Sequence, residues 1–205
     1  MHNIISKTMK NSKEMILKKA FCLFMSSGYE RTSVKDLENA IGKTRGAIFY
    51  FFKSKQELFE AVIDKYIVDT QHVNSKFNIP EHVTLKEFIF IYIDGINKTM
   101  YKMVSLSISN VYKAYFSLYL DASKYYPNFA EVAARNSEAE VRLWEMVIKE
   151  AINTKEIRVV DAHAYALLFR SCFLGTSFER CLTTGLNVEE LLRVYLEVYD
   201  SIRLN

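Results

Sequence analysis

The 205-residue sequence contains only 2 Pro and 6 Gly. Because these residues interrupt helices and build turns, their scarcity excludes a loop-rich or collagen-like chain and favours long helices. The 3 cysteines are an odd number and lie in apolar helical patterns, which argues against a disulfide framework and indicates reduced thiols. No run of 18 or more apolar residues occurs, and the N-terminus lacks a continuous hydrophobic signal core. We therefore expect no membrane partner and a cytoplasmic, nucleoid-associated protein.

Catalytic and metal-binding signatures are scarce as well. None of the 4 histidines has partners at metal-ligand spacing. The sequence also lacks a Gly-rich phosphate loop, an HExxH motif, a nucleophile elbow and a Cys-His-Asn pattern. We expect no enzyme, no catalytic residue, no metal and no cofactor.

What is present is a compact pattern of short helices in residues 32–58. Side chains that cap helix starts occur at three places: Thr32 or Ser33, Thr44, and Ser54. Between the first two, Gly42 stands where the chain must reverse, and glycine adopts positive φ without steric cost. This pattern predicts a helix-turn-helix, in which the second helix enters the major groove of DNA. A generic helical hairpin is the alternative that spacing alone leaves open.

The segment from Gly42 to Leu58, GKTRGAIFYFFKSKQEL, resembles the N-terminal DNA-binding motif of the TetR family of transcriptional regulators. The resemblance covers residues 12–60, and the roughly 200-residue helical chain is of the size that this family implies. It departs from the family pattern at four positions. Phe49 replaces a tyrosine that donates its hydroxyl to phosphate, Phe51 replaces a histidine or tyrosine, Glu38 replaces a small alanine, and Lys43 replaces an apolar valine. Long side chains extend their charged ends into water from partly buried sites, so we expect the fold to tolerate these changes. What they affect is how the protein contacts DNA.

The resemblance implies that the helix at 44–51 lies in the major groove. Arg45 is the expected base-reading residue, because a guanidinium bonds bidentately to guanine. Gly46 and Ala47 allow close approach, and Thr44 and Tyr50 contact base edges or phosphates. Four further residues, with the amides at helix starts, are expected to contact phosphates or to border this surface: Thr32, Ser33, Lys53 and Lys55. Phe49 completes the predicted DNA-binding set.

Charge supports this assignment. Residues 1–58 contain 11 Lys or Arg and 5 Asp or Glu, whereas residues 59–205 contain 16 and 19. The positive excess thus coincides with the predicted helix-turn-helix, where phosphate charge must be neutralised. Taken alone, the positive charge would favour a solvated lysine-rich face; its coincidence with the motif reverses that.

The whole chain is predicted to be all-α, with about nine helices. We expect a helix-turn-helix domain at residues 1–54, a linker helix at 55–78 and a helical effector-binding and dimerisation domain at 79–205. Long helices are expected at about 12–25, 55–77, 84–104, 107–124, 128–153, 161–182 and 188–203.

In the resembled family, the last two helices pair across a two-fold axis as a four-helix bundle, which implies a homodimer that suits a palindromic operator. Packing of these helices onto the chain's own core is the alternative. The predicted dimer interface consists of Leu168, Ser171, Cys172, Gly175, Phe178, Leu191, Tyr195, Val198 and Ile202.

Residues 88–126 hold ten aromatic residues, about twice the share expected from the 14% of the whole chain. Ligand pockets are mostly apolar and aromatic, although such a stripe also suits a plain core. The resembled family binds its effector between these helices, which implies a small, partly hydrophobic effector. The predicted pocket residues are Phe88, Tyr92, Met100, Met103, Tyr112, Tyr115, Phe116, Tyr119 and Trp144.

The sequence thus predicts a ligand-responsive transcriptional repressor that binds double-stranded DNA as a homodimer. Three alternatives remain open. In the first, the N-terminal helices form a protein-interaction module; in the second, the chain is a DNA-binding regulator without a small-molecule effector. In the third, the C-terminal helices form a domain that processes a small molecule, which the residue inventory does not support.

Overall fold

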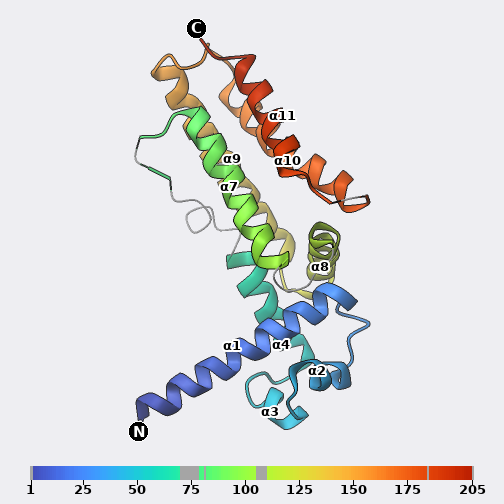
Figure 1. Ribbon diagram of the computed structural model, residues 1–205. Helices are drawn as coiled ribbons and strands as arrows, with labels where there is room; N and C mark the ends of the chain where they lie inside the picture. Colours follow the sequence, from blue (N-terminus) through green and yellow to red (C-terminus); the bar gives the residue numbers. More distant parts are fainter. Residues whose placement is uncertain (1, 70–78, 81, 105–109, 184, 205) are drawn as a thin grey trace. The chain divides into compact units, whose positions relative to one another are not determined.

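Helices dominate the computed structural model of the protein (Figure 1). The structure describes residues 2–69, 79–80, 82–104, 110–183 and 185–204. Within these ranges there is no β-strand, and one antiparallel bridge joins Ile157 to Arg203. The all-α prediction is therefore confirmed. No helix in the described ranges is long and apolar enough to cross a membrane.

The chain divides into two compact units, each built from two stretches of sequence. Unit 1 contains Met1–Thr70 and Ala114–Phe129, and unit 2 contains Gln71–Lys113 and Ala130–Asn205. The predicted domain limits after residues 54 and 78 stay predictions. Much of the second half of the predicted linker helix, at 70–78, lies outside the described residues.

Unit 1 carries the predicted helix-turn-helix. Its helices are α1 (His2–Ser27), α2 (Val34–Ile41), α3 (Arg45–Phe49), α4 (Lys55–Ile63), the π-helical segment η1 (Asp64–Val68) and most of α8 (Val111–Tyr125). The three predicted caps are present, because Ser33, Thr44 and Ser54 each accept a hydrogen bond from a backbone amide of the following helix. Gly28, with φ of 80°, follows the end of α1.

The linker helix is not a continuous α-helix. It begins at Lys55 as predicted, but η1 follows directly on α4 and widens the backbone hydrogen-bonding pattern at residues 64–68. Single π-helical turns within α-helices are rare and are frequently found at functional sites.

The core of unit 1 is aromatic and joins α1 to α4. The rings of Phe24 and Phe59 pack edge to face with centroids 5.3 Å apart, and both side chains are fully buried. Tyr29, after α1, packs against Phe59 with centroids 4.5 Å apart. Such pairs contribute about 0.5–1.5 kcal/mol each beyond the burial of their area. Buried Leu37 and Ile48 extend this core to the two short helices, and thereby position them.

Unit 2 contains the remaining long helices. They are α7 (Leu85–Val104), α9 (Phe129–Asn153, except its first residue), α10 (Ala162–Cys181) and α11 (Val188–Asp200). Asp161 caps α10 as predicted, and Asn187 caps α11 by accepting from the amides of Glu189 and Glu190. The helix α11 packs against both α7 and α10.

An aromatic cluster fills the core of unit 2. Trp144 is at its centre and stacks on Phe169 with centroids 4.7 Å apart and nearly parallel rings. Three further buried rings lie around this pair: Phe88, Tyr92 and Tyr195. The indole N–H of Trp144 is buried without a hydrogen-bond partner.

Candidate nucleic-acid interface

The turn between α2 and α3 is closed by Gly42, which adopts φ of 71° and ψ of 35°. Its amide donates to the carbonyl oxygen of Glu38 at 2.8 Å, and the amide of Lys43 donates to the same oxygen at 3.3 Å. No atom lies within 4 Å of the position that a Cβ of Gly42 would occupy. Glycine is therefore required at this turn for its left-handed backbone rather than for space.

Ser33 and Asp36 form a reciprocal capping box at the start of α2. The hydroxyl and the amide of Ser33 donate to Oδ2 of Asp36 at 2.6 and 2.8 Å, and the amide of Asp36 donates to Oγ of Ser33 at 3.1 Å. The hydrogen bonds from Ser33 lower the pKa of the Asp36 carboxyl. Asp36 was not singled out from the sequence, although a serine followed three residues later by an acidic residue is the signature of this motif.

The start of α3 has two acceptors. Oγ1 of Thr44 accepts from the amide of Ala47 at 3.4 Å, and Oε1 of Glu38 accepts from the amide of Arg45 at 2.7 Å. The second contact was not foreseen, because the sequence showed only that Glu38 replaces a smaller residue. It connects α2 directly to the first residue of α3.

The exposed face of α3 carries the predicted base-reading residues. Arg45 and Gly46 are exposed, and no atom lies within 4 Å of the position of a Cβ on Gly46. The guanidinium of Arg45 lies 5.9 Å from the centroid of the half-buried Phe49 ring. Tyr50, which follows α3, is 70% exposed. The surface therefore offers a cation, an open glycine and a phenol to a ligand that approaches α3.

The start of α4 adds exposed polar groups beside this surface. Oγ of Ser54 accepts from the amide of Glu57 at 3.0 Å, and Oε2 of Glu57 accepts from the amide of Lys53 at 2.6 Å. The side chain of Lys53 is exposed. It remains available to contact an anion.

Lys55 and Thr32, both predicted phosphate contacts, have intramolecular partners. The Nζ of Lys55 donates to the carbonyl oxygens of Tyr29 and Thr32, each at 2.8 Å. Burial lowers the pKa of Lys55. Thr32 is 1% exposed and its hydroxyl donates to the carbonyl oxygen of Gly28 at 2.7 Å. In this conformation, both side chains hold the loop between α1 and α2.

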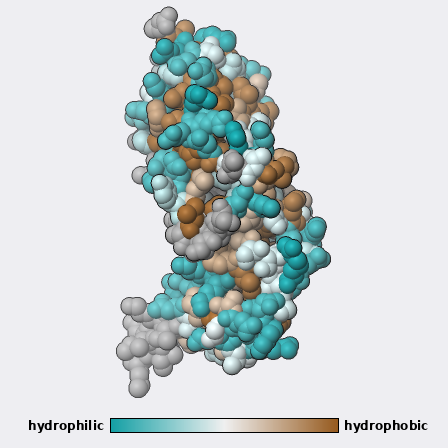
Figure 2. Space-filling model, turned by 45° about the vertical axis from the view of Figure 1, so that its right-hand side comes forward, coloured by the Kyte–Doolittle hydropathy of each residue, from teal (hydrophilic) through white to brown (hydrophobic). Residues whose placement is uncertain are grey.

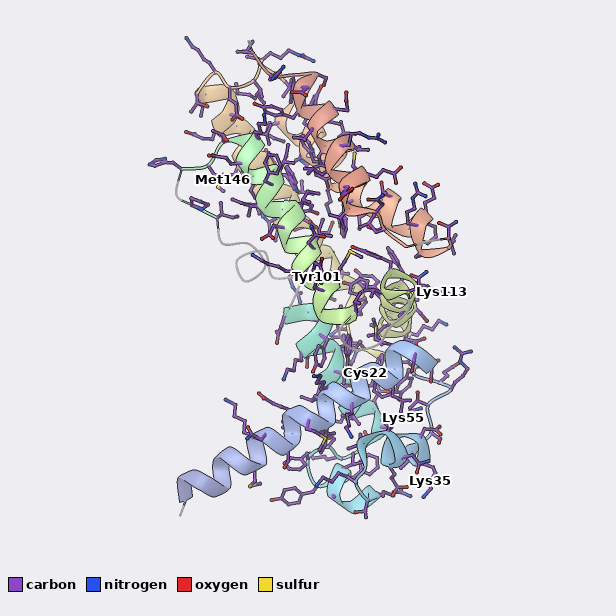
Figure 3. The ribbon with its side chains drawn as sticks, in the orientation of Figure 1. Cys22, Lys35, Lys55, Tyr101, Lys113 and Met146 are labelled. Atoms are coloured by element: carbon purple, nitrogen blue, oxygen red, sulfur yellow. The ribbon has the colours of Figure 1, made fainter. Side chains whose placement is uncertain are left out.

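Figure 3 shows Lys35 on α2 and Lys55 at α4 in unit 1. The predicted DNA-binding residues outside α3 fall at three places. Thr44 and Tyr50 flank α3, Thr32 and Ser33 precede α2, and Lys53 and Lys55 lie at the start of α4. Their roles as DNA contacts stay predictions.

The predicted pocket residues are divided between the two units. Tyr115, Phe116 and Tyr119 belong to unit 1, whereas the others belong to unit 2. Phe88, Tyr92 and Trp144 are completely buried in the aromatic cluster, and Tyr112 packs against Phe173 with centroids 6.4 Å apart. Met100 is half-buried, and the side chain of Met103 lies outside the described residues. The assignment of these residues to a pocket stays a prediction.

A partly buried chain of polar side chains borders this cluster. The hydroxyl of Tyr92 donates to Oε1 of Glu140 at 2.6 Å, and Oε2 of Glu140 lies 3.3 Å from Nε of Arg170. Burial, followed by the nearby Glu140 charge, raises the pKa of Tyr92 well above its ordinary value. The carboxylate of Glu140 is thus paired with a donor and a cation inside unit 2.

The predicted dimer-interface residues fall into two groups. Four of them form an exposed stripe on α10 at spacings of three or four residues: Leu168, Ser171, Gly175 and Phe178. Leu182, just after α10, is also exposed and extends the stripe, although it was not predicted. By contrast, Leu191 and Tyr195 on α11, and Ile202 just after it, are fully buried in the core of unit 2. Val198 on α11 and Cys172 on α10 are half-buried. Tyr195 also donates to the carbonyl oxygen of Phe169 at 2.6 Å. Leu191, Tyr195 and Ile202 therefore pack α11 and the residues after it onto the core of unit 2.

Figure 2 shows hydrophobic residues gathered among polar ones in the part of the surface that belongs to the C-terminal helices. Five exposed large apolar residues come from these two helices: Leu167, Leu168, Phe178, Val194 and, just after α10, Leu182.

Comparison with known proteins identifies the N-terminal segment. Residues 16–62 match the family described as "Bacterial regulatory proteins, tetR family". Residues 16–62 thus form a segment of the tetR-family type. The match contains α2, α3, the turn at Gly42 and all of α4 except its last residue.

Two curated relatives resemble the TetR-family segment. The HTH-type transcriptional repressor AcnR of Corynebacterium efficiens is 48% identical over 52 residues, which are 25% of this chain and 28% of AcnR. An uncharacterized HTH-type transcriptional regulator in the lacX 3'region of Lactococcus lactis is 33% identical over 98 residues, 45% of this chain and 50% of that protein. The chain thus spans from about a quarter to one half of the length of these relatives.

The likeness of fold extends over nearly the whole chain. The crystal structure of a regulator from Saccharomonospora viridis in complex with choline has a TM-score of 0.73 at 15% identity, with 96% of this chain and 100% of that chain covered. A TetR-family structure from Rhodococcus has a TM-score of 0.68 at 18% identity, with 94% and 98% covered. At this identity, the likeness concerns the fold alone.

Proposed function

We propose that this chain is a DNA-binding transcriptional repressor of the TetR family that acts as a homodimer on a palindromic operator in the cytoplasm. A small, partly hydrophobic effector releases it from DNA. The observation that carries the proposal is the exposed surface of α3, where Arg45, Gly46 and Tyr50 face solvent in a segment that matches the tetR family. Its neighbourhood is rich in positive charge, as phosphate contact requires.

Each subunit would insert α3 into one major groove. Arg45 is the candidate for reading guanine, because its exposed guanidinium matches the two acceptors on that base. The missing side chain of Gly46 lets the backbone of α3 approach the bases closely. Lys53 is the candidate for a phosphate contact that carries no sequence information.

The exposed stripe on α10 supports the homodimer. Its five positions alternate at three and four residues and therefore lie on one face of the helix. Large apolar side chains exposed in a row mark a protein-interaction surface, and the small Ser171 and Gly175 permit close approach of a second helix. Two-fold pairing of this stripe with its own copy would give the symmetry of a palindromic operator.

The route from effector to DNA, in this proposal, includes the residues of α8 in unit 1. Oδ2 of Asp121 accepts from the amide of Tyr29 at 2.8 Å, which ties α8 to the loop between α1 and α2. The hydroxyl of Tyr126 donates to Oδ1 of Asp64 at 2.5 Å, at the first residue of η1. A shift of α8 on effector binding would therefore displace the loop between α1 and α2 and the first residue of η1. The linker helix would then pivot and change the spacing between the two copies of α3.

The effector class is inferred from composition and fold. The aromatic share of residues 88–126 suits a partly hydrophobic guest. The S. viridis regulator, whose fold is similar, was crystallised with choline, so a fold of this type accommodates a small organic molecule.

One observation favours the second candidate, a DNA-binding regulator without an effector. Three of the predicted pocket residues, Phe88, Tyr92 and Trp144, are 0% exposed and pack against one another. A thermal-shift screen of hydrophobic compounds distinguishes the two candidates. Stabilisation by a compound supports the effector, since a ligand that binds only the folded state raises the unfolding temperature. Unchanged unfolding temperatures across the whole screen favour the second candidate.

DNA binding itself is tested by selecting duplexes from fragmented genomic DNA with the full-length protein. The affinity of the best duplex is then measured from 50 to 200 mM salt. We expect the logarithm of the association constant to fall linearly with the logarithm of the salt concentration, because phosphate contacts release counterions. An affinity independent of salt, or selection of no duplex at all, would reject the proposal in favour of a protein-interaction module.

A further inference from the structure

Glu38 accepts three backbone hydrogen bonds around a single turn. Its carbonyl oxygen accepts from the amides of Gly42 and Lys43, at 2.8 and 3.3 Å. Its carboxylate Oε1 accepts from the amide of Arg45 at 2.7 Å. One residue near the end of α2 thus binds the turn, from Gly42 to Lys43, and also the first residue of α3.

The two oxygens of the Glu38 carboxylate have different neighbours. The side chain of Glu38 is 24% exposed, and its second oxygen lies 4.0 Å from Nζ of Lys35, one turn earlier on α2. That ion pair is long and solvent-exposed on the lysine side, so it contributes little. The hydrogen bond to Arg45 is charge-assisted and shorter, and it is the contact that fixes the carboxylate.

The helix α3 depends on such outside contacts for its orientation. It has five residues, Arg45–Phe49, which is too short for a helix to be stable by itself in water. Its own cap is weak in geometry, because the hydrogen bond from the amide of Ala47 to Thr44 is 3.4 Å long. The hydrogen bond that the amide of Arg45 donates to Glu38 is therefore the shorter polar constraint on the N-terminal end of α3.

This hydrogen bond constrains Arg45, the residue that is expected to read a base. The amide of Arg45 is fixed by Glu38, while its guanidinium extends over the ring of Phe49 at 5.9 Å. A bidentate contact with a base depends on the position and direction of the side chain, and a small shift of its backbone changes both.

We propose that Glu38 is a positioning residue for sequence recognition. Through its bond to the Arg45 amide it sets the direction in which the Arg45 side chain leaves α3, and so it determines how well the protein distinguishes its operator from other DNA. This inference rests on the proposed function, because it requires that α3 reads bases.

The test compares Glu38→Ala with Glu38→Gln in the full-length protein. Glutamine keeps a side-chain oxygen that accepts from the Arg45 amide, whereas alanine has none. Dissociation constants are measured for the selected operator and for an unrelated duplex of equal length, at one salt concentration. Glu131→Gln, an exposed change of charge on α9, is the matched control.

We expect Glu38→Ala to lower the ratio of operator to unrelated affinity by about tenfold, within the range of a lost base contact. Glu38→Gln should restore the ratio to within about threefold of the unmodified protein, and Glu131→Gln should leave it unchanged. A variant that merely unfolds in part weakens both duplexes together and keeps the ratio, so the ratio separates positioning from stability.

Two results would overturn the inference: an unchanged ratio in Glu38→Ala, or a loss in Glu38→Gln as large as that in Glu38→Ala. Failure of the proposed function would give a different experimental result. In that case, the unmodified protein itself binds no duplex in a salt-dependent manner.

Discussion

The ammonium group of Lys55 lies 4.1 Å from the centroid of the Tyr29 ring and donates a 2.8 Å hydrogen bond to the Tyr29 carbonyl oxygen. The two residues connect the start of α4 to the loop that follows α1. A residue predicted from the sequence as a phosphate contact therefore has a structural task inside unit 1. The structural contact and the predicted phosphate contact can be tested separately, because the first affects the free energy of unfolding and the second affects the affinity for DNA.

Replacement of Lys55 by alanine should lower the free energy of unfolding by about 2 kcal/mol, because hydrogen bonds to charged groups contribute roughly 1.5–3 kcal/mol. Urea denaturation measures this change. Lys53→Ala is the matched control, since the side chain of Lys53 is exposed. The control should keep its stability, while its affinity falls alike for all duplexes and its salt slope decreases by about 1. Equal stabilities of the two variants would contradict the structural role of Lys55.

Replacement of Arg45 by alanine should relax sequence preference, with a loss of about 1–3 kcal/mol in discrimination at one base pair of each half-site. The measurement is a binding series over operators with single base changes. Lys43→Ala, an exposed lysine in the turn before α3, is the control for loss of positive charge. If Arg45→Ala retains the preferred operator, base reading belongs to Tyr50 or Thr44 instead.

Replacement of Phe178 by glutamate should dissociate the proposed homodimer. Phe178 is 57% exposed on the apolar stripe of α10, and a charge placed in an apolar interface lacks a partner when it is buried. We expect a loss of about 2 kcal/mol or more, roughly a 30-fold rise in the dimer dissociation constant. Light scattering after size-exclusion chromatography gives the mass. Val159→Glu, at an exposed valine outside the stripe, should remain dimeric. If the Phe178→Glu variant remains dimeric, the dimer interface lies on another surface of the protein.

The contact between Tyr126 and Asp64 predicts a dependence of stability on alkaline pH. The hydrogen bond to Asp64, together with burial, raises the pKa of Tyr126 from 10.0 to about 12. The folded protein therefore holds this proton more tightly than the unfolded chain. The stabilisation is fully present below pH 10 and is lost as the pH rises from about 10 to about 12. In Tyr126→Phe, the free energy of unfolding should fall less over this interval.

Urea denaturation at several pH values measures this difference. Tyr50→Phe, which changes an exposed tyrosine, is the control and should follow the unmodified protein. A Tyr126→Phe curve parallel to that of the unmodified protein would mean that the hydrogen bond to Asp64 does not contribute in solution.

Local sequence signals predicted the local structure around the turn. The capping residues Ser33, Thr44 and Ser54 are where the sequence analysis expected them, and Gly42 has the left-handed backbone that the reversal requires. These features depend on residues within one or two turns of each other, so they are readable from spacing. The same is true of Asp161, which caps α10.

The sequence was less informative where a residue has two uses or a distant partner. Leu191 and Phe178 belong to similar apolar helical patterns, yet the first is buried against its own chain and the second is exposed. Periodicity reports that a face is apolar, not what covers it. The π-helical segment at residues 64–68 likewise has no signal in the apolar pattern of the linker helix.

The helix-turn-helix, the all-helical class and the resemblance of residues 16–62 to the tetR family can be read from the sequence, because they follow from short-range caps, a glycine turn and a long motif. Which polar groups already have partners depends on the tertiary structure. It showed that Glu38 accepts from the amide of Arg45 seven residues away, and that Lys55 donates to Tyr29 across 26 residues of sequence. Partners at these separations are set by how helices pack, and packing depends on the side chains of a whole unit at once.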